Sequence, residues 1–482
     1  MKKFQFLLLI VIFSCSSRTN SDKSDKVILI KEFSKFQSQT KKSIENDSEI
    51  NWDQKLDSLN QFLELKKLYE FTSIEETNFD DKVKWFTENS KITSSKSLIN
   101  KTNFYFENSL SMNGYLDGDK FRSSMAEIIY NLNEDSMNTY FVNTKVHKTD
   151  SILDKIRSKN ISVGDIGNSD HKFIFKNAIK NAANNNLSIV VTDGIYSMSG
   201  GKLTMGDVEK DIEKAFESAL KQNELETVVL KMTSNFKGRY YSESCPKKGG
   251  IEINQTRPYY ILLFGNKEII DQSLEEIVVI SELKGYEAQS RFFITKEMKV
   301  DYSVLLNGED KKGVFKPNDR SNKIIKSIIL EKRFQPRNSE LKDAYFQFAV
   351  GVNFNDFSIP KEYLLNPKNY FVSNNTDYQI IEIKGKESVD ESTKNDIKTR
   401  NSEFSHIMII KGKSKLYGDV NIQLDIKTPT WIKESGSDND CKIQNDTTTT
   451  FSLDRLMFGI SKAYERVNEK TEYFNLIIKI NI

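Results

Sequence analysis

Two stretches decide the fold of the central region: YFENSLSMNGYLDGDKF at residues 105–121 and SIVVTDGIYS at residues 188–197. In the first, an aromatic run breaks into a turn rich in Ser, Asn and Gly, and a helical pattern that includes Phe121 and Met125 follows. In the second, a continuous apolar run ends in Thr-Asp-Gly, as a buried strand does before its turn. Each stretch therefore predicts a strand whose carboxyl end carries polar side chains.

The surrounding residues alternate between strand and helix patterns. We expect helices at 173–183 and from about 207 to 220, and buried strands at 227–232 and 259–264. Strands separated by helices in this order predict an α/β fold with a parallel, doubly wound sheet and helices on both faces. Ligands of such sheets bind at the carboxyl ends of the strands.

Two of these strand ends carry oxygen donors. Glu107, Ser109 and Ser111 alternate after the first strand, and Asp193 follows the later one. A carboxylate and two hydroxyls on one side of a turn, closed by a second carboxylate, are hard donors of the kind that Mg²⁺ takes together with waters. Ser and Asp are also common in turns and helix caps, so a purely structural role for the four residues stays open.

The two stretches resemble the von Willebrand factor A-like family, and the resemblance covers residues 100–280. That family has a Rossmann-like doubly wound sheet and a metal-ion-dependent adhesion site, made of Asp-x-Ser-x-Ser, a Thr from a second loop and a late Asp. The residues that match these positions here are Glu107, Ser109, Ser111, Ser169 and Asp193. The resemblance implies a bound Mg²⁺ or Mn²⁺ that completes its coordination with an acidic group of a partner.

The match departs from the family pattern at two positions. Glu107 stands where the family has Asp, and its extra methylene displaces the carboxylate, which matters for a cation as strict in its geometry as Mg²⁺. Ser169 stands in place of Thr, and the neighbouring Asp170 is the alternative residue for that position. The first departure favours a metal-free domain, and this alternative stays open.

The amino terminus indicates export and lipid attachment. A basic start and an apolar run over residues 4–13, too short to span a bilayer, precede Cys15. Residues 12–15 resemble the lipobox of bacterial lipoproteins, which implies a signal peptide at 1–14 and acyl chains on Cys15 that tether the protein to the membrane. A buried strand with an accidental cysteine is the alternative. Ser16 after the cysteine favours, by resemblance to the sorting rule, the outer membrane of a Gram-negative bacterium.

The remaining organisation follows from changes in pattern along the chain. A polar tether at 15–27 precedes a helical segment at 28–99, which has neither proline nor glycine up to about residue 95. After the α/β domain at 100–280, we expect a connecting β-rich segment at 281–335. Strict alternation of apolar residues predicts a β-sandwich-like C-terminal domain at 336–482.

Composition excludes two classes of protein. The chain has 70 Lys and Arg against 68 Asp and Glu, so it lacks the basic excess of a nucleic-acid binder. Three His and three Cys leave little material for a zinc site. Cys245 and Cys441 could pair in an oxidising compartment, although the sequence does not place them within bonding range of each other.

Together these patterns predict a lipid-anchored envelope protein with a non-enzymatic task. We expect it to hold an unidentified protein or other envelope partner at the strand-end face, through a divalent cation. The alternatives are a metal-dependent phosphoesterase of the envelope, built on the same sheet and carboxylates, and a metal-free scaffold in an envelope assembly.

Overall fold

The computed structural model describes residues 98–196, 204–295, 298–317, 323–329, 345–355, 357–373, 377–399, 403–412, 418–468 and 470–481. The predicted signal peptide, Cys15, the polar tether and nearly all of the predicted helical segment lie outside these residues. Among the helices that are described, none combines the length and the apolar character that crossing a bilayer requires.

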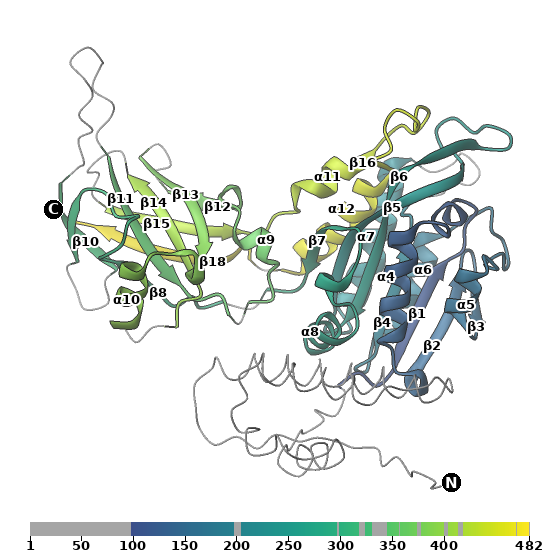
Figure 1. Cartoon of the computed structure of the whole chain (residues 1–482), viewed down its shortest axis with the longest axis horizontal. Coiled ribbons are helices and arrows are strands. Elements are labelled where there is room, and N and C mark those ends of the chain that lie inside the picture. The colour runs from purple at the N-terminus through teal and green to yellow at the C-terminus, as the bar shows by residue number, and fades with distance from the viewer. Residues whose placement is uncertain are drawn as a thin grey trace, which may run out of the picture. The chain divides into compact units, whose positions relative to one another are not determined.

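A seven-stranded sheet in the order β3-β2-β1-β4-β6-β5-β7 forms the centre of the α/β part (Figure 1). Its strands are β1 (Thr102–Glu107), β2 (Met137–Val142), β3 (Val146–Thr149), β4 (Leu187–Thr192), β5 (Glu226–Tyr240), β6 (Ile251–Gly265) and β7 (Tyr286–Phe292). Strand β1 pairs in parallel with β2 and β4. The remaining pairings, β2 with β3, β4 with β6, β5 with β6 and β5 with β7, are antiparallel. The fold is therefore mixed α/β.

The expectation of a parallel sheet is correct for β1, β2 and β4 and wrong for β6. The runs at 227–232 and 259–264 are parts of two 15-residue strands, β5 and β6. These strands form one long hairpin, closed by residues 241–250. A connection of this length is too short for a parallel crossover, which takes a dozen residues or more and is usually a helix. Strand β7 also belongs to this sheet, beyond the predicted domain boundary at residue 280.

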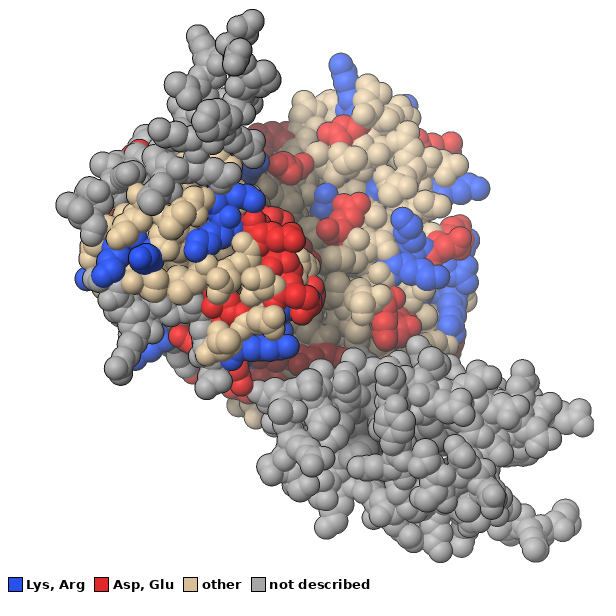
Figure 2. All heavy atoms as spheres, turned by 60° about the vertical axis from the view of Figure 1, so that its left-hand side comes forward, with Lys and Arg blue, Asp and Glu red and all other residues tan. Residues whose placement is uncertain are grey.

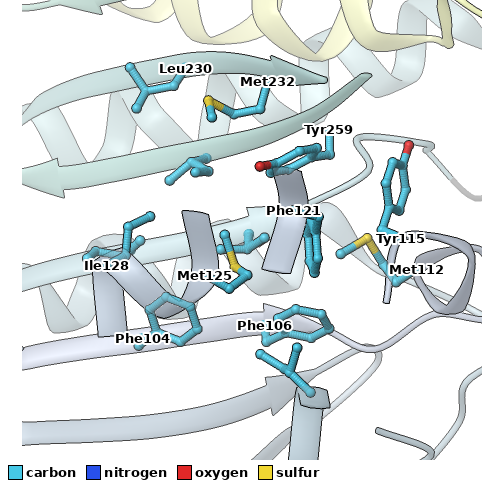
Figure 3. Packing of buried hydrophobic residues seen from close by; sticks show 14 of the residues in the cluster. Phe104, Phe106, Met112, Tyr115, Phe121, Met125, Ile128, Leu230, Met232 and Tyr259 are labelled. Atoms are coloured by element: carbon cyan, nitrogen blue, oxygen red, sulfur yellow. The ribbon is translucent and has the colours of Figure 1, made fainter. Parts of the chain in front are cut away.

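Helices cover both faces of the sheet because alternate strand residues point to opposite faces. On one face, α4 (Asp119–Tyr130), α5 (Ile152–Arg157) and α8 (Lys267–Glu276) share a core with Phe104 and Phe106 of β1. On the other face, α6 (His171–Asn181), α7 (Met205–Leu220) and α12 (Leu453–Val467) share a core with Tyr105. Figure 3 shows Phe121, Met125 and Ile128 of α4 packed over the strands of the first face.

The β-rich part has two sheets around a common core. One has the order β12-β15-β18-β10-β9 and the other β13-β14-β11-β8. Their strands are β8 (Tyr302–Leu305), β9 (Val314–Pro317), β10 (Ile324–Ile329), β11 (Phe346–Val352), β12 (Tyr370–Val372), β13 (Tyr378–Gly385), β14 (His406–Gly412), β15 (Gly418–Asp425) and β18 (Glu472–Ile480). Alternate residues of β15 and β18 are buried in this core, as their sequence pattern predicts.

The shorter elements complete the described chain. They are α9 (Lys361–Leu364), α10 (Glu391–Thr399), α11 (Thr430–Ser435), β16 (Gly436–Ser437), β17 (Thr450–Phe451) and the 3₁₀ turns η2 (Ser111–Tyr115), η3 (Glu134–Ser136), η4 (Ile280–Glu282), η5 (Pro367–Asn369) and η6 (Lys386–Ser388).

The sequence pattern suggested that the C-terminal third forms a separate β domain. In the structure, part of it belongs to the α/β part. Helix α12 packs along α7, where Gly459 lies close to Ile212 and to the carbonyl of Glu209. Leu453, Leu456 and Ile460 of α12 join the core of the α/β part. The chain therefore leaves the seven-stranded sheet after β7, builds most of the β-rich part, returns at 430–467 and ends in β18.

Charge on the described surface is mixed, as the near-neutral composition predicts. On the face shown in Figure 2, acidic and basic side chains occur side by side, and neither sign covers the described residues. The exposed side chains thus show no single-sign field on this face that would steer a polyanion.

Candidate functional site

The carboxyl ends of β1 and β4 lie side by side in the centre of the sheet. Their parallel register pairs Phe106 with Val191, so the next residue of each strand, Glu107 in β1 and Thr192 in β4, lies at the same level of the sheet. All five predicted site residues, Glu107, Ser109, Ser111, Ser169 and Asp193, are buried at this edge. The parallel pairing of β1 with β4 brings these segments together.

Glu107 is held by hydroxyl groups from two other segments. Ser169 Oγ donates to its Oε1 over 2.6 Å, and Thr192 Oγ1 donates to its Oε2. Burial raises the pKa of Glu107, while the hydrogen bonds from Ser169, Thr192 and Ser109 lower it. Both carboxylate oxygens therefore already have donors within the protein.

His171 extends this network behind Glu107. Its Nε2 lies 3.1 Å from Thr192 Oγ1, which also accepts from the backbone N–H of Gly194 over 2.8 Å. Because the Thr192 hydroxyl gives its hydrogen to Glu107, His171 must donate from Nε2, which fixes the tautomer. Burial lowers the pKa of His171 to about 4, so the ring is neutral near pH 7.

Asp193 is the second buried carboxylate of the site, 1% exposed. Its Oδ1 accepts from the backbone N–H of Ile195 over 3.0 Å, and its Oδ2 has no hydrogen-bond partner. Burial and, next, the charge of Glu107 raise the pKa of Asp193 to about 7, against a smaller lowering by the Ser111 hydroxyl. Two neighbouring carboxylates that are both shielded from water disfavour each other's charge.

The hydroxyls complete an all-oxygen donor set. Ser109 Oγ and Ser111 Oγ lie 3.0 Å apart. Ser169 donates its hydrogen to Glu107, so its oxygen lone pairs remain available. Carboxylate and hydroxyl oxygens fit Mg²⁺ or Mn²⁺ better than they fit a softer metal. Within the described residues, no three His, Cys, Asp or Glu side chains could hold a metal by themselves, so a cation here would depend on serine hydroxyls and waters.

Asp170, the alternative to Ser169, has a structural role. Its side chain accepts from the backbone N–H of Phe173 over 2.9 Å and caps the amino terminus of α6. Capping places Asp170 at the start of the helix and leaves Ser169 facing Glu107.

Sequence reasoning missed Thr192 and His171. Thr192 directly precedes Asp193, and a hydroxyl inside a Thr-Asp-Gly strand end was a usable signal. His171 lies two residues after Ser169, but an isolated histidine is more often a satisfied core residue, and here it is both buried and hydrogen-bonded.

Cys245 and Cys441 form a disulfide, with 5.1 Å between their Cα atoms. It links the closed end of the β5–β6 hairpin to the segment between β16 and β17. The pairing that the sequence left open is therefore present in the structure.

Comparison of the chain with protein-family models, with curated proteins and with solved structures found no match in any of the three.

Proposed function

We propose that this chain is a lipid-anchored envelope protein whose strand-end site binds a divalent cation, and through it an acidic group of a partner. The observation that carries the proposal is Asp193 Oδ2, a buried carboxylate oxygen without a partner. A buried polar atom without a hydrogen bond needs an explanation, and an absent ion or water is a common one.

The surroundings of Asp193 make a cation the better explanation. Glu107 and Asp193 are two buried acids beside each other, and the one ring that could carry a positive charge there, His171, is held neutral by its burial. A divalent cation would compensate both carboxylates at once, where a water would compensate neither charge.

The same contacts suggest how the residues would divide the work. Asp193 Oδ2 and the hydroxyls of Ser109, Ser111 and Ser169 would hold the cation. Glu107 would lie behind them and accept hydrogens from the hydroxyls, which orients their lone pairs toward the ion. In that position the extra methylene of Glu107 is harmless, because the residue is no direct ligand. The bound ion would supply a positive centre for an acidic oxygen of the partner.

The finer assignments belong to the same proposal. The convergence of the five residues supports a von Willebrand A-like site on a Rossmann-like sheet, although β6 runs against the direction that a purely parallel sheet would require. The two sheets with one core support a sandwich-like C-terminal part. Lipidation of Cys15 and location in the outer membrane rest on the amino-terminal sequence.

Calorimetric titration of the full-length chain in detergent with MgCl₂ and MnCl₂ tests the cation site. Asp193→Ala should abolish binding, whereas Asp154→Ala, which removes an exposed carboxylate of α5, should leave binding unchanged. Failure of the unmodified chain to bind either ion at millimolar concentration would contradict the proposal.

Cross-linking and pull-down from membranes test the partner. Capture should need Mg²⁺ or Mn²⁺ and should be lost with chelator. A partner that stays bound whatever the chelator concentration would instead favour the metal-free scaffold, which the complete hydrogen bonding of Glu107 by protein hydroxyls allows.

A further inference from the structure

Arg257 of β6 is a buried cation that forms no ion pair with any carboxylate of the described residues. It is 1% exposed and is among the largest fully buried side chains of the described chain. Its Nη2 donates to the carbonyl of Thr449 over a long 3.4 Å, while Nε and Nη1 have no hydrogen-bond partner. Nε carries one hydrogen and Nη1 two, so three of the five N–H donors of the guanidinium are unused.

The unused donors cannot be explained by a neutral side chain. Arginine stays charged in proteins, so Arg257 cannot lose its proton to suit its burial. Within the part of the chain that the structure describes, no carboxylate forms an ion pair with it. Arg291 of β7, also buried, shows the usual solution: it contacts Glu226 over 2.7 Å and Asp271 over 2.6 Å.

Aromatic rings offset part of the cost of burying Arg257. Its guanidinium carbon lies 4.6 Å from the ring centroid of Tyr240 and 5.9 Å from that of Phe236. A ring in such a contact attracts the cation through its face. The N–H donors point outward in the plane of the guanidinium, so these contacts do not satisfy them. The arrangement holds the cation and leaves the hydrogens on Nε and Nη1 without acceptors.

The walls around Arg257 are fixed by a second set of contacts. Asp440 accepts from Tyr240 Oη over 2.8 Å and from Ser242 Oγ over 2.7 Å, and it also accepts from the backbone N–H groups of residues 243 and 244. The neighbouring Cys441 is bonded to Cys245. The hairpin that carries Tyr240 and the segment that carries Thr449 are thereby locked together.

A surface hollow lies next to this region and is separated from the guanidinium by Thr449. It has a volume of about 360 Å³ and is lined by Asn439, Cys441, Lys442, Ile443, Asn445, Asp446 and Thr449. Thr449, whose carbonyl accepts from Arg257, thus borders both the hollow and the guanidinium. Amide groups and the Lys442 ammonium favour the approach of a small anion, whereas Asp446 opposes it; the Asp446 carboxylate is held by Thr448 and Thr449.

We infer that Arg257 anchors a binding site for a small oxyanion, a carboxylate or phosphate group, enclosed between the β5–β6 hairpin and the segment 436–450. A guanidinium edge with free N–H groups matches two oxygens of such a group. This inference goes beyond the proposed cation site and does not depend on it.

Thermal unfolding of the full-length chain in detergent tests the site, with EDTA present so that no divalent cation contributes. Sodium phosphate should raise the unfolding midpoint saturably, relative to sodium chloride of equal ionic strength. Sodium acetate provides the second arm: a stronger effect of acetate than of phosphate assigns the site to a carboxylate, and the reverse assigns it to a phosphate group.

Three variants separate a ligand site from a structural arginine. Arg257→Lys keeps the positive charge but loses the planar pair of N–H donors. It should weaken anion binding, as seen in the rise of the unfolding midpoint, by about tenfold or more. Arg257→Met should abolish the anion effect without lowering the midpoint in chloride, because no ion pair is broken. Arg291→Met, the matched control, should lower the midpoint strongly and keep the anion effect.

The inference is overturned if neither anion shifts the midpoint of the unmodified chain, or if Arg257→Met responds to them as the unmodified chain does. It is also overturned if Arg257→Met unfolds as readily as Arg291→Met, because Arg257 would then be a structural residue like its counterpart.

Discussion

Two buried charge clusters in the α/β part differ in how their charges are balanced. Arg291 of β7 lies between Glu226 of β5 and Asp271 of α8, and each charge has an opposite partner. At the carboxyl edge of the sheet, Glu107 and Asp193 are two acids that form no ion pair with a Lys or Arg side chain of the described chain. The difference separates a cluster that the fold completes by itself from one that, under the proposed function, a bound cation completes.

The largest effect is expected from breaking the complete cluster. Arg291→Met should destabilise the protein by about 3–5 kcal/mol, because it leaves the buried Glu226 carboxylate without its cation. Urea unfolding followed by circular dichroism measures the change. A loss below about 1 kcal/mol would mean that Glu226 finds water or another donor, and the two clusters would then not differ as described.

The strand-end cluster should respond in the opposite sense. Asp193→Asn removes one of two like charges and keeps the acceptor for the N–H of Ile195. In EDTA at pH 8 it should stabilise the protein by about 1–3 kcal/mol, and it should abolish the stabilisation that Mg²⁺ gives to the unmodified chain.

The stabilisation expected for Asp193→Asn depends on pH. The pKa of Asp193 is raised in the folded state, to about 7, because of burial and the charge of Glu107. The folded protein therefore holds this proton more tightly than the unfolded chain, and stability is lost as the pH rises through the folded pKa. The advantage of Asp193→Asn should shrink from pH 8 to pH 5. An advantage that stays the same at both values would contradict the assignment.

The smallest effect is expected for a charge pair that is complete but exposed. Lys221 and Glu217 form an ion pair over 2.6 Å at the end of α7, where the lysine side chain is 64% exposed. Lys221→Ala should leave the free energy of unfolding almost unchanged, and high salt should reduce the effect further. A cost comparable to that of Arg291→Met would show that pairing, and not burial, decides the energetics of these clusters.

The sequence predicted the strand-end site better than the architecture around it. The apolar runs of β1 and β4 and the helical spacing of Phe121 and Met125 depend on local pattern alone, which is why they could be recognised. The β5–β6 hairpin could not be recognised in the same way, because a buried strand has the same pattern in either direction. Its pairing depends on contacts between residues far apart in the chain.

The partners of single charged residues lay beyond prediction. Ser169 was assigned by resemblance to a metal-ligand position, and its hydrogen bond to Glu107 was not predicted. Arg257 lies between the polar first half and the apolar second half of β6, and nothing near it in sequence indicates that its charge is unpaired. Helix α12 packs on the sheet and also along α7, more than 200 residues earlier, and this second contact could not be predicted because only the returning chain creates it.

The disulfide closes a covalent loop around the whole of the described β-rich chain between β7 and α11. A single protease cut anywhere between Cys245 and Cys441, for example in the segment between β10 and β11, leaves both fragments joined. They would migrate as one chain until a reductant is added. For an exported chain, as proposed above, the compartment that keeps such bonds oxidised also contains proteases, and the bond would keep a nicked chain in one piece there.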